Sequence, residues 1–118
     1  MTILVVDDDR VSRAVLRRIL ENLGHRVEEA PDAMAALEAV AVAPPDLVIT
    51  DWVMPGMGGA ELIGTLRASG FDGPVWFTVP RSDPDPAAGL AAGGQASVRK
   101  PFEPNEIEAQ LAQICDTG

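Results

Sequence analysis

Acidic side chains follow two apolar runs, and the only lysine of the chain closes a third. The run at residues 3–6 leads into three aspartates at 7–9, the run at 47–49 leads through Thr50 into Asp51, and Lys100 follows the short run at 96–98 and Arg99. Carboxylates gathered at one edge of a sheet would repel one another by several kcal/mol at an effective dielectric of ~20. A divalent metal and a lysine would neutralise this charge, and together they would also receive a phosphoryl group.

The hydrophobic pattern predicts five strand–helix repeats that would position these groups. Such alternation gives a parallel sheet with right-handed crossover connections. The expected strands are residues 3–7, 27–30, 46–50, 75–79 and 96–99. The expected helices are about 10–23, 33–42, 59–68 and 85–92, with a last helix that begins at 103–104. The fourth of these helices is short, and the sequence around it is rich in proline and glycine.

The ends of the first two helices carry recognisable signals. Asp9 and Asp32 are candidate N-caps, and Gly24 stands where a helix C-terminus favours glycine. Within the first helix, apolar residues recur every four positions with two leucines beside them: Val11, Val15, Ile19 and Leu23, with Leu16 and Leu20. The strand at 27–30 is the most polar, which predicts an edge position in the sheet.

Three motifs, taken in order and at these spacings, resemble the receiver domain of two-component response regulators. They are Val5-Val6-Asp7-Asp8, Asp51-Trp52-Val53-Met54-Pro55 and Lys100-Pro101-Phe102. The resemblance covers the whole chain and implies one receiver domain over residues 1–118. It also implies the flavodoxin-like doubly wound α/β fold, (βα)5 with strand order 2-1-3-4-5, in which strands one and three meet at the ligand-binding switch point.

The resemblance implies a role for each polar residue of the site. Asp51 would accept the phosphoryl group, and Lys100 would pair with the phosphoryl oxygens. Mg²⁺ would be held directly by Asp8 and Asp51, by the backbone carbonyl of Val53, and by Asp7 through a water, an oxygen-only set that suits this ion. A cis peptide bond before Pro101 belongs to the same pattern and is physically accessible before proline.

The switch hydroxyl of the family has two candidate positions. Counting forward from Pro74 places it at Val79, and counting back from Lys100 places it at Thr78. The next residue should donate its backbone N–H to the phosphoryl group, and Pro80 has no N–H to donate. This favours Thr78 with the Val79 N–H as donor. Ser97 stands where many receivers carry an aromatic residue that moves with the hydroxyl, so the usual coupling is in question.

The implied partners are a histidine kinase or a histidine phosphotransfer protein, with an output domain or downstream protein reading a face made by the fourth helix, the fifth strand and the fifth helix. The chain would be a phosphoacceptor signalling domain rather than an enzyme acting on a separate substrate.

The net charge of −9 argues against direct nucleic-acid binding. No apolar run approaches the ~18 residues of a membrane span. A single cysteine excludes an internal disulfide, and a cytoplasmic location is expected.

Two other functional classes share some of these features. Asp7-x-Asp9-x-Val11 after an apolar strand matches the first motif of haloacid-dehalogenase-like phosphatases, with Thr78 and Lys100 as candidate later motifs. That family also needs a late pair of acids after another strand, and the acids after Lys100 fall in the predicted last helix. A pseudo-receiver that binds partners without phosphorylation is the second alternative, favoured by Val79-Pro80 and by Ser97.

Overall fold

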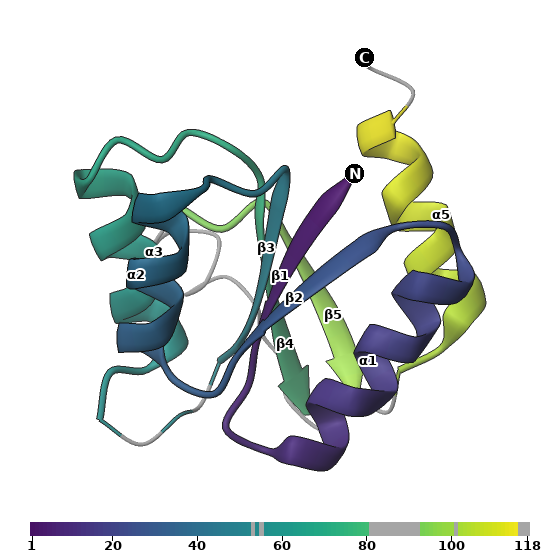
Figure 1. Cartoon of the computed structure of the whole chain (residues 1–118). Helices are drawn as coiled ribbons and strands as arrows, with labels where there is room; N and C mark the ends of the chain where they lie inside the picture. Colours follow the sequence, from purple (N-terminus) through teal and green to yellow (C-terminus); the bar gives the residue numbers. More distant parts are fainter. Residues whose placement is uncertain (53, 55, 81–92, 101, 116–118) are drawn as a thin grey trace.

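The protein is a five-stranded parallel sheet covered by helices on both faces (Figure 1). The computed structural model describes residues 1–52, 54, 56–80, 93–100 and 102–115. The strands are β1 (Thr2–Val6), β2 (Arg26–Ala30), β3 (Leu47–Asp51), β4 (Val75–Pro80) and β5 (Ala96–Lys100). The described helices are α1 (Arg10–Asn22), α2 (Ala33–Val42), α3 (Gly59–Ala68) and α5 (Pro104–Cys115). The strand order β2-β1-β3-β4-β5 confirms the predicted fold, with the polar β2 at one edge.

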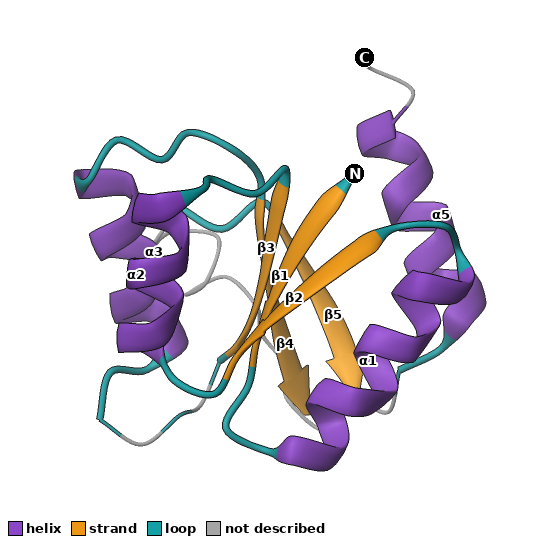
Figure 2. Cartoon of the chain, in the orientation of Figure 1, coloured by secondary structure: helices purple, strands orange, loops and turns teal. Residues whose placement is uncertain are grey.

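Alternation along the strands divides the core between the two faces of the sheet. In β1, Ile3 and Val5 pack toward α1 and α5, whereas Leu4 and Val6 pack toward α2 and α3. Successive side chains of a strand point to opposite faces, so a central strand buried on both sides is apolar throughout. Figure 2 shows the two resulting helical layers, α2 with α3 on one side and α1 with α5 on the other.

Helix α1 begins and ends as its sequence signals predict. The Asp9 side chain accepts a hydrogen bond from the Val11 backbone N–H at 3.1 Å, and Gly24 has a positive φ of 92°. The buried residues of α1, however, are Leu16 and Leu20. Val11 and Val15 are 69% and 44% exposed, because a strict four-residue spacing drifts around a helix of 3.6 residues per turn.

Three strands extend one residue further than their sequence patterns predicted. Asp51, Pro80 and Lys100 are the last residues of β3, β4 and β5. The backbone ladder therefore reaches Asp51 and Lys100 themselves and fixes the positions of their main-chain atoms. The predicted fourth helix at 85–92 and the peptide bond before Pro101 lie outside the described residues.

Candidate functional site

The carboxylates meet because β1 and β3 are hydrogen-bonded neighbours in register. Val6 lies opposite Thr50, so the residues that follow, Asp7 and Asp51, emerge at the same carboxyl edge of the sheet. One oxygen from each of Asp7, Asp8 and Asp51 lies within 4.8 Å of the others. The sheet thus brings together the three acids expected to share a site.

Lys100 reaches this cluster from β5, the edge strand that lies furthest from β2. Its Nζ lies 3.1 Å from Asp7 Oδ2 and 3.4 Å from Asp51 Oδ1, although β3 and β4 separate β5 from β1. The aliphatic stem of a lysine is long enough to span such a gap while its ammonium stays with the carboxylates. Lys100 therefore lies within the acidic cluster, where its ammonium contacts two of the three acids.

The two candidate switch residues occupy different environments. Thr78 pairs with Asp51 across β3 and β4, and its hydroxyl donates to Asp51 Oδ1 at 3.2 Å. Val79 is 2% exposed and packs in the hydrophobic cluster on the side of α2 and α3. In the described part of the chain, the hydroxyl that touches the central carboxylate is that of Thr78.

The surroundings of the cluster raise the pKa of two of its groups, Asp51 and Lys100. Burial raises the pKa of Asp51, and the neighbouring charge of Asp7 raises it further. Burial disfavours the charged form of Lys100, but the hydrogen bond with Asp7 and the charges of Asp51 and Asp7 outweigh it, so the pKa of Lys100 is raised. Lys100 is therefore cationic at neutral pH. Any further positive charge that approaches Asp51 would stabilise the ionised form of its carboxylate.

The donor set fits a hard divalent cation. Three carboxylates lie close together, two of them in contact with the Lys100 ammonium, and carboxylate oxygen atoms are the ligands that Mg²⁺ prefers. Both oxygens of Asp7 are engaged, with the Asp9 backbone N–H donating to Oδ1 at 2.8 Å and Lys100 to Oδ2. Asp8 is exposed, and its carboxylate accepts no hydrogen bond from any described residue. Val53, the expected carbonyl ligand, lies outside the described residues.

Two residues that sequence reasoning did not single out support the site. The Arg13 guanidinium donates to the backbone carbonyl of Asp7 at 2.8 Å. A Cβ on Gly59, the first residue of α3, would lie only 2.5 Å from the carbonyl oxygen of Asp51. Arg13 was concealed among four arginines on one predicted helix, whereas the Gly58-Gly59 dipeptide was a usable signal for close backbone approach.

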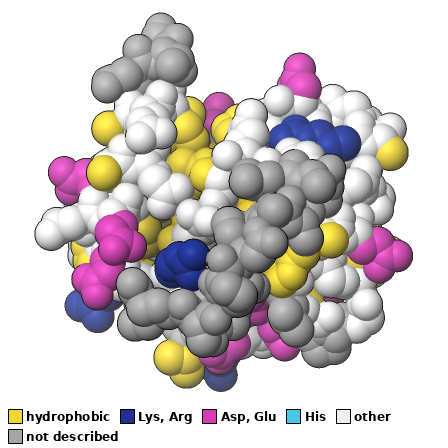
Figure 3. Space-filling view, turned by 180° about the vertical axis from the view of Figure 1, so that it is seen from behind, with side chains coloured by type: hydrophobic (Ala, Val, Ile, Leu, Met, Phe, Trp, Pro, Cys, Tyr) yellow, Lys and Arg dark blue, Asp and Glu magenta, His cyan; other side chains and the backbone are white. Residues whose placement is uncertain are grey.

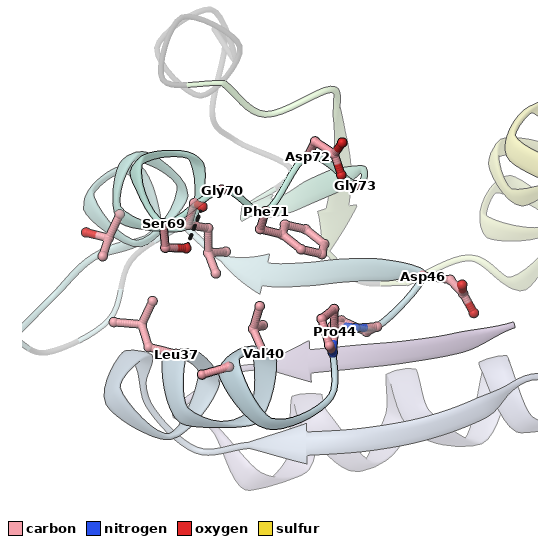
Figure 4. A pocket seen from close by; sticks show the side chains of 13 residues that line it. Leu37, Val40, Pro44, Asp46, Ser69, Gly70, Phe71, Asp72 and Gly73 are labelled. Carbon is pink, nitrogen blue, oxygen red and sulfur yellow. Dashed lines mark hydrogen bonds between the residues drawn. The ribbon is translucent and has the colours of Figure 1, made fainter.

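A hollow of about 770 Å³ lies between α2 and the connection from α3 to β4 (Figure 4). Leu37 and Val40 line it from α2, and Phe71 and Asp72 line it from the opposite side. Its lining includes Asp46, which precedes β3, so the hollow is near the end of the sheet opposite Asp51. Its lining is mainly apolar and contains none of the acids of the cluster.

Comparison with known proteins agrees with this arrangement. The family model described as "Response regulator receiver domain" matches residues 3–112. The chain belongs to the response regulator receiver domain family. This receiver is 41% identical over 115 residues to the response regulator MprA of Mycobacterium avium (strain 104), covering 97% of the chain. The family match favours the receiver interpretation over a haloacid-dehalogenase-like phosphatase.

Solved structures resemble the receiver along nearly its whole length. A putative response regulator from Chloroflexus aurantiacus J-10-fl superimposes with a TM-score of 0.91 at 30% identity, over 96% of this chain and 95% of that one. The Vibrio cholerae chemotaxis protein CheY4 gives a TM-score of 0.87 at 29% identity, over 95% and 96%.

The receiver spans about half the length of the curated relatives it matches, 50% for the M. avium protein. Within the described part of the chain, no helix is long and apolar enough to cross a membrane.

Proposed function

We propose that this receiver, over residues 1–118, takes a phosphoryl group from a phosphohistidine onto Asp51 in a two-component or phosphorelay system. The observation that carries the proposal is the convergence of three carboxylates, one lysine ammonium and one threonine hydroxyl at a single sheet edge. Family membership supports the same chemistry. The donor is a histidine kinase or a histidine phosphotransfer protein, and the reaction takes place in the cytoplasm.

In the proposed reaction, an Asp51 carboxylate oxygen bonds to phosphorus while the phosphorus–nitrogen bond of the donor breaks. The imidazole nitrogen leaves with the bonding electron pair, and the phosphoryl group becomes an aspartyl phosphate. Phosphoryl transfer depends mainly on positioning and on charge stabilisation. Thr78 orients Asp51 through its hydroxyl, and Lys100 donates to an oxygen of the transferred group.

Mg²⁺ would be held by Asp8, Asp51 and the Val53 carbonyl, with Asp7 one water further away. When bound, it supplies positive charge to the equatorial phosphoryl oxygens. The engagement of both Asp7 oxygens within the protein supports its indirect role, and the exposed Asp8 supports a direct one. Lys100 remains in place to pair with Asp7 and with the incoming group.

The output face departs from the family pattern, because Ser97 cannot fill the space of an aromatic side chain. Ser97 is half-buried, and its carbonyl accepts a hydrogen bond from Gln110 of α5 at 3.3 Å. This bond ties β5 to α5 through the main chain of Ser97 and does not involve the serine hydroxyl. Acidic side chains are scattered over the back face, and its Lys and Arg side chains are separate spots without a broad basic patch among the coloured atoms (Figure 3). We therefore propose a protein partner rather than direct nucleic-acid binding.

Incubation with acetyl phosphate and Mg²⁺, followed by intact-mass measurement, tests the acceptor. We expect addition of one phosphoryl group, its abolition in Asp51→Asn, and its retention in the control Asp72→Asn, an exposed acid away from the cluster. An unmodified wild-type protein, under conditions that label another receiver, would favour the pseudo-receiver alternative. Labelling of Asp51→Asn would move the acceptor to another residue.

A further inference from the structure

Asp7 is the most completely hydrogen-bonded member of the cluster. Its backbone N–H donates to the Ala30 carbonyl at 3.2 Å, and its two carboxylate oxygens accept from the Asp9 N–H and from Lys100. Its own carbonyl accepts from Arg13 Nη1 at 2.8 Å. Asp7 is 3% exposed, so water has little access to replace a missing partner.

Arg13 makes this contact from a fixed position. Its Nε lies 3.2 Å from Glu29 Oε1 on β2, while Nη1 faces the Asp7 carbonyl. Its side chain is only 16% exposed. The planar guanidinium donates in two directions at once, which a lysine ammonium cannot reproduce in the same geometry. Arg13 therefore links the edge strand β2 to the loop that follows β1.

We infer that Arg13 is a positioning residue for the loop between β1 and α1, residues 7–9, whose acids would hold the metal. Arg13 holds this loop through the main-chain carbonyl of Asp7. The carbonyl of Asp7 belongs to the peptide that joins Asp7 to Asp8, so fixing that carbonyl also fixes the direction in which Asp8 leaves the strand. Partners that orient metal ligands are worth ~10–100-fold in metal affinity. This inference rests on the proposed Mg²⁺ site and adds a residue that touches neither the metal nor the phosphoryl group.

Arg17 provides a matched control on the same helix. It pairs with the same Glu29 and also with Glu21, but its side chain is 44% exposed and its contacts with these two glutamates lie away from the Asp7 carbonyl. Removing either arginine changes the charge equally and removes one partner of Glu29. Only the loss of Arg13 frees the Asp7 carbonyl.

The experiment compares Arg13→Gln, Arg13→Lys and Arg17→Gln with the wild type. Glutamine and lysine have similar helix propensity to arginine, so α1 should persist, which circular dichroism checks. Mg²⁺ titrations followed by Trp52 fluorescence should give ~10-fold weaker binding for Arg13→Gln and an unchanged affinity for Arg17→Gln. Arg13→Lys should remain close to Arg13→Gln, because charge alone does not restore the two-directional contact.

A second, metal-free measurement separates this inference from the proposed function. Hydrogen exchange over residues 7–12 should be faster in Arg13→Gln than in Arg17→Gln, since the Asp9 N–H bonds to the Asp7 side chain. Full recovery in Arg13→Lys, equal effects of the two glutamine variants, or wild-type affinity in Arg13→Gln would each overturn the positioning role. If the wild type bound no Mg²⁺, the proposed metal site would be wrong. Independently of that result, unchanged hydrogen exchange in Arg13→Gln would overturn the inference that Arg13 restrains the loop.

Discussion

Replacement of Gly59 by alanine should damage the protein at the point where α3 meets the end of β3. The new Cβ would lie 2.5 Å from the Asp51 carbonyl oxygen and 2.8 Å from the Trp52 Cα, both backbone atoms. Ordinary contact begins at 3.4 Å, so the helix and the strand end must move apart. The Gly59 N–H also donates to the Trp52 carbonyl at 2.9 Å, and this bond would stretch as they separate.

The expected cost follows from two opposing effects. Overpacking of this kind destabilises by about 1–3 kcal/mol, and alanine returns roughly 0.5–1 kcal/mol of helix propensity. The difference between these two effects is roughly 0–2.5 kcal/mol, and we expect Gly59→Ala to lower the free energy of unfolding by about 1 kcal/mol. A displacement near 1 Å at Asp51 should also slow phosphorylation by acetyl phosphate by about 100-fold.

Gly64→Ala is the internal control, because Gly64 lies in the same helix and a Cβ added there would meet nothing within 4 Å. This variant should be about 0.5–1 kcal/mol more stable than the wild type and should phosphorylate normally. Urea unfolding measures both variants. If Gly59→Ala were stabilised to the same extent as Gly64→Ala, the steric argument would be refuted.

Three further expectations concern the site and its surroundings. Thr78→Val should slow phosphorylation of Asp51, whereas a larger effect from Val79→Ala would assign the switch position to Val79. The aspartyl phosphate should be long-lived, because the side chains of Val53 and Pro80 cannot hydrogen-bond an attacking water; Val53→Asn should shorten its lifetime, and unchanged decay would contradict this. The hydrogen bond from Arg17, opposed by burial and aided by Arg13, lowers the pKa of Glu29. The ionised Glu29 carboxylate thus stabilises the folded state above its unfolded pKa of 4.5, and this stabilisation is lost as the pH falls through the lower folded pKa. Glu29→Gln should cost up to about 1 kcal/mol at neutral pH and nothing in strong acid, and a pH-independent cost would refute the charge argument.

The local sequence was sufficient to predict the strand–helix alternation and most element boundaries. Apolar runs interrupted by glycine and proline specify where each element begins and ends, and Asp9 and Asp32 cap α1 and α2 as their positions indicated. The inward face of α1 was harder to predict, since its valines and leucines are equally apolar. Packing against the sheet buried Leu16 and Leu20 and left Val11 at the surface.

The sequence by itself determined which residue types end the strands, and so which chemistry is available at one edge of the sheet. Only the tertiary structure decided the distances between these groups, because Asp7, Asp51 and Lys100 lie at or just after the ends of strands that are far apart in the chain. The in-register pairing of Asp51 with Thr78 is equally a property of the sheet. The contacts of Arg13 and Gly59 were decided by the tertiary structure for the same physical reason: each acts on a backbone carbonyl, and no residue type reveals where a distant carbonyl will lie.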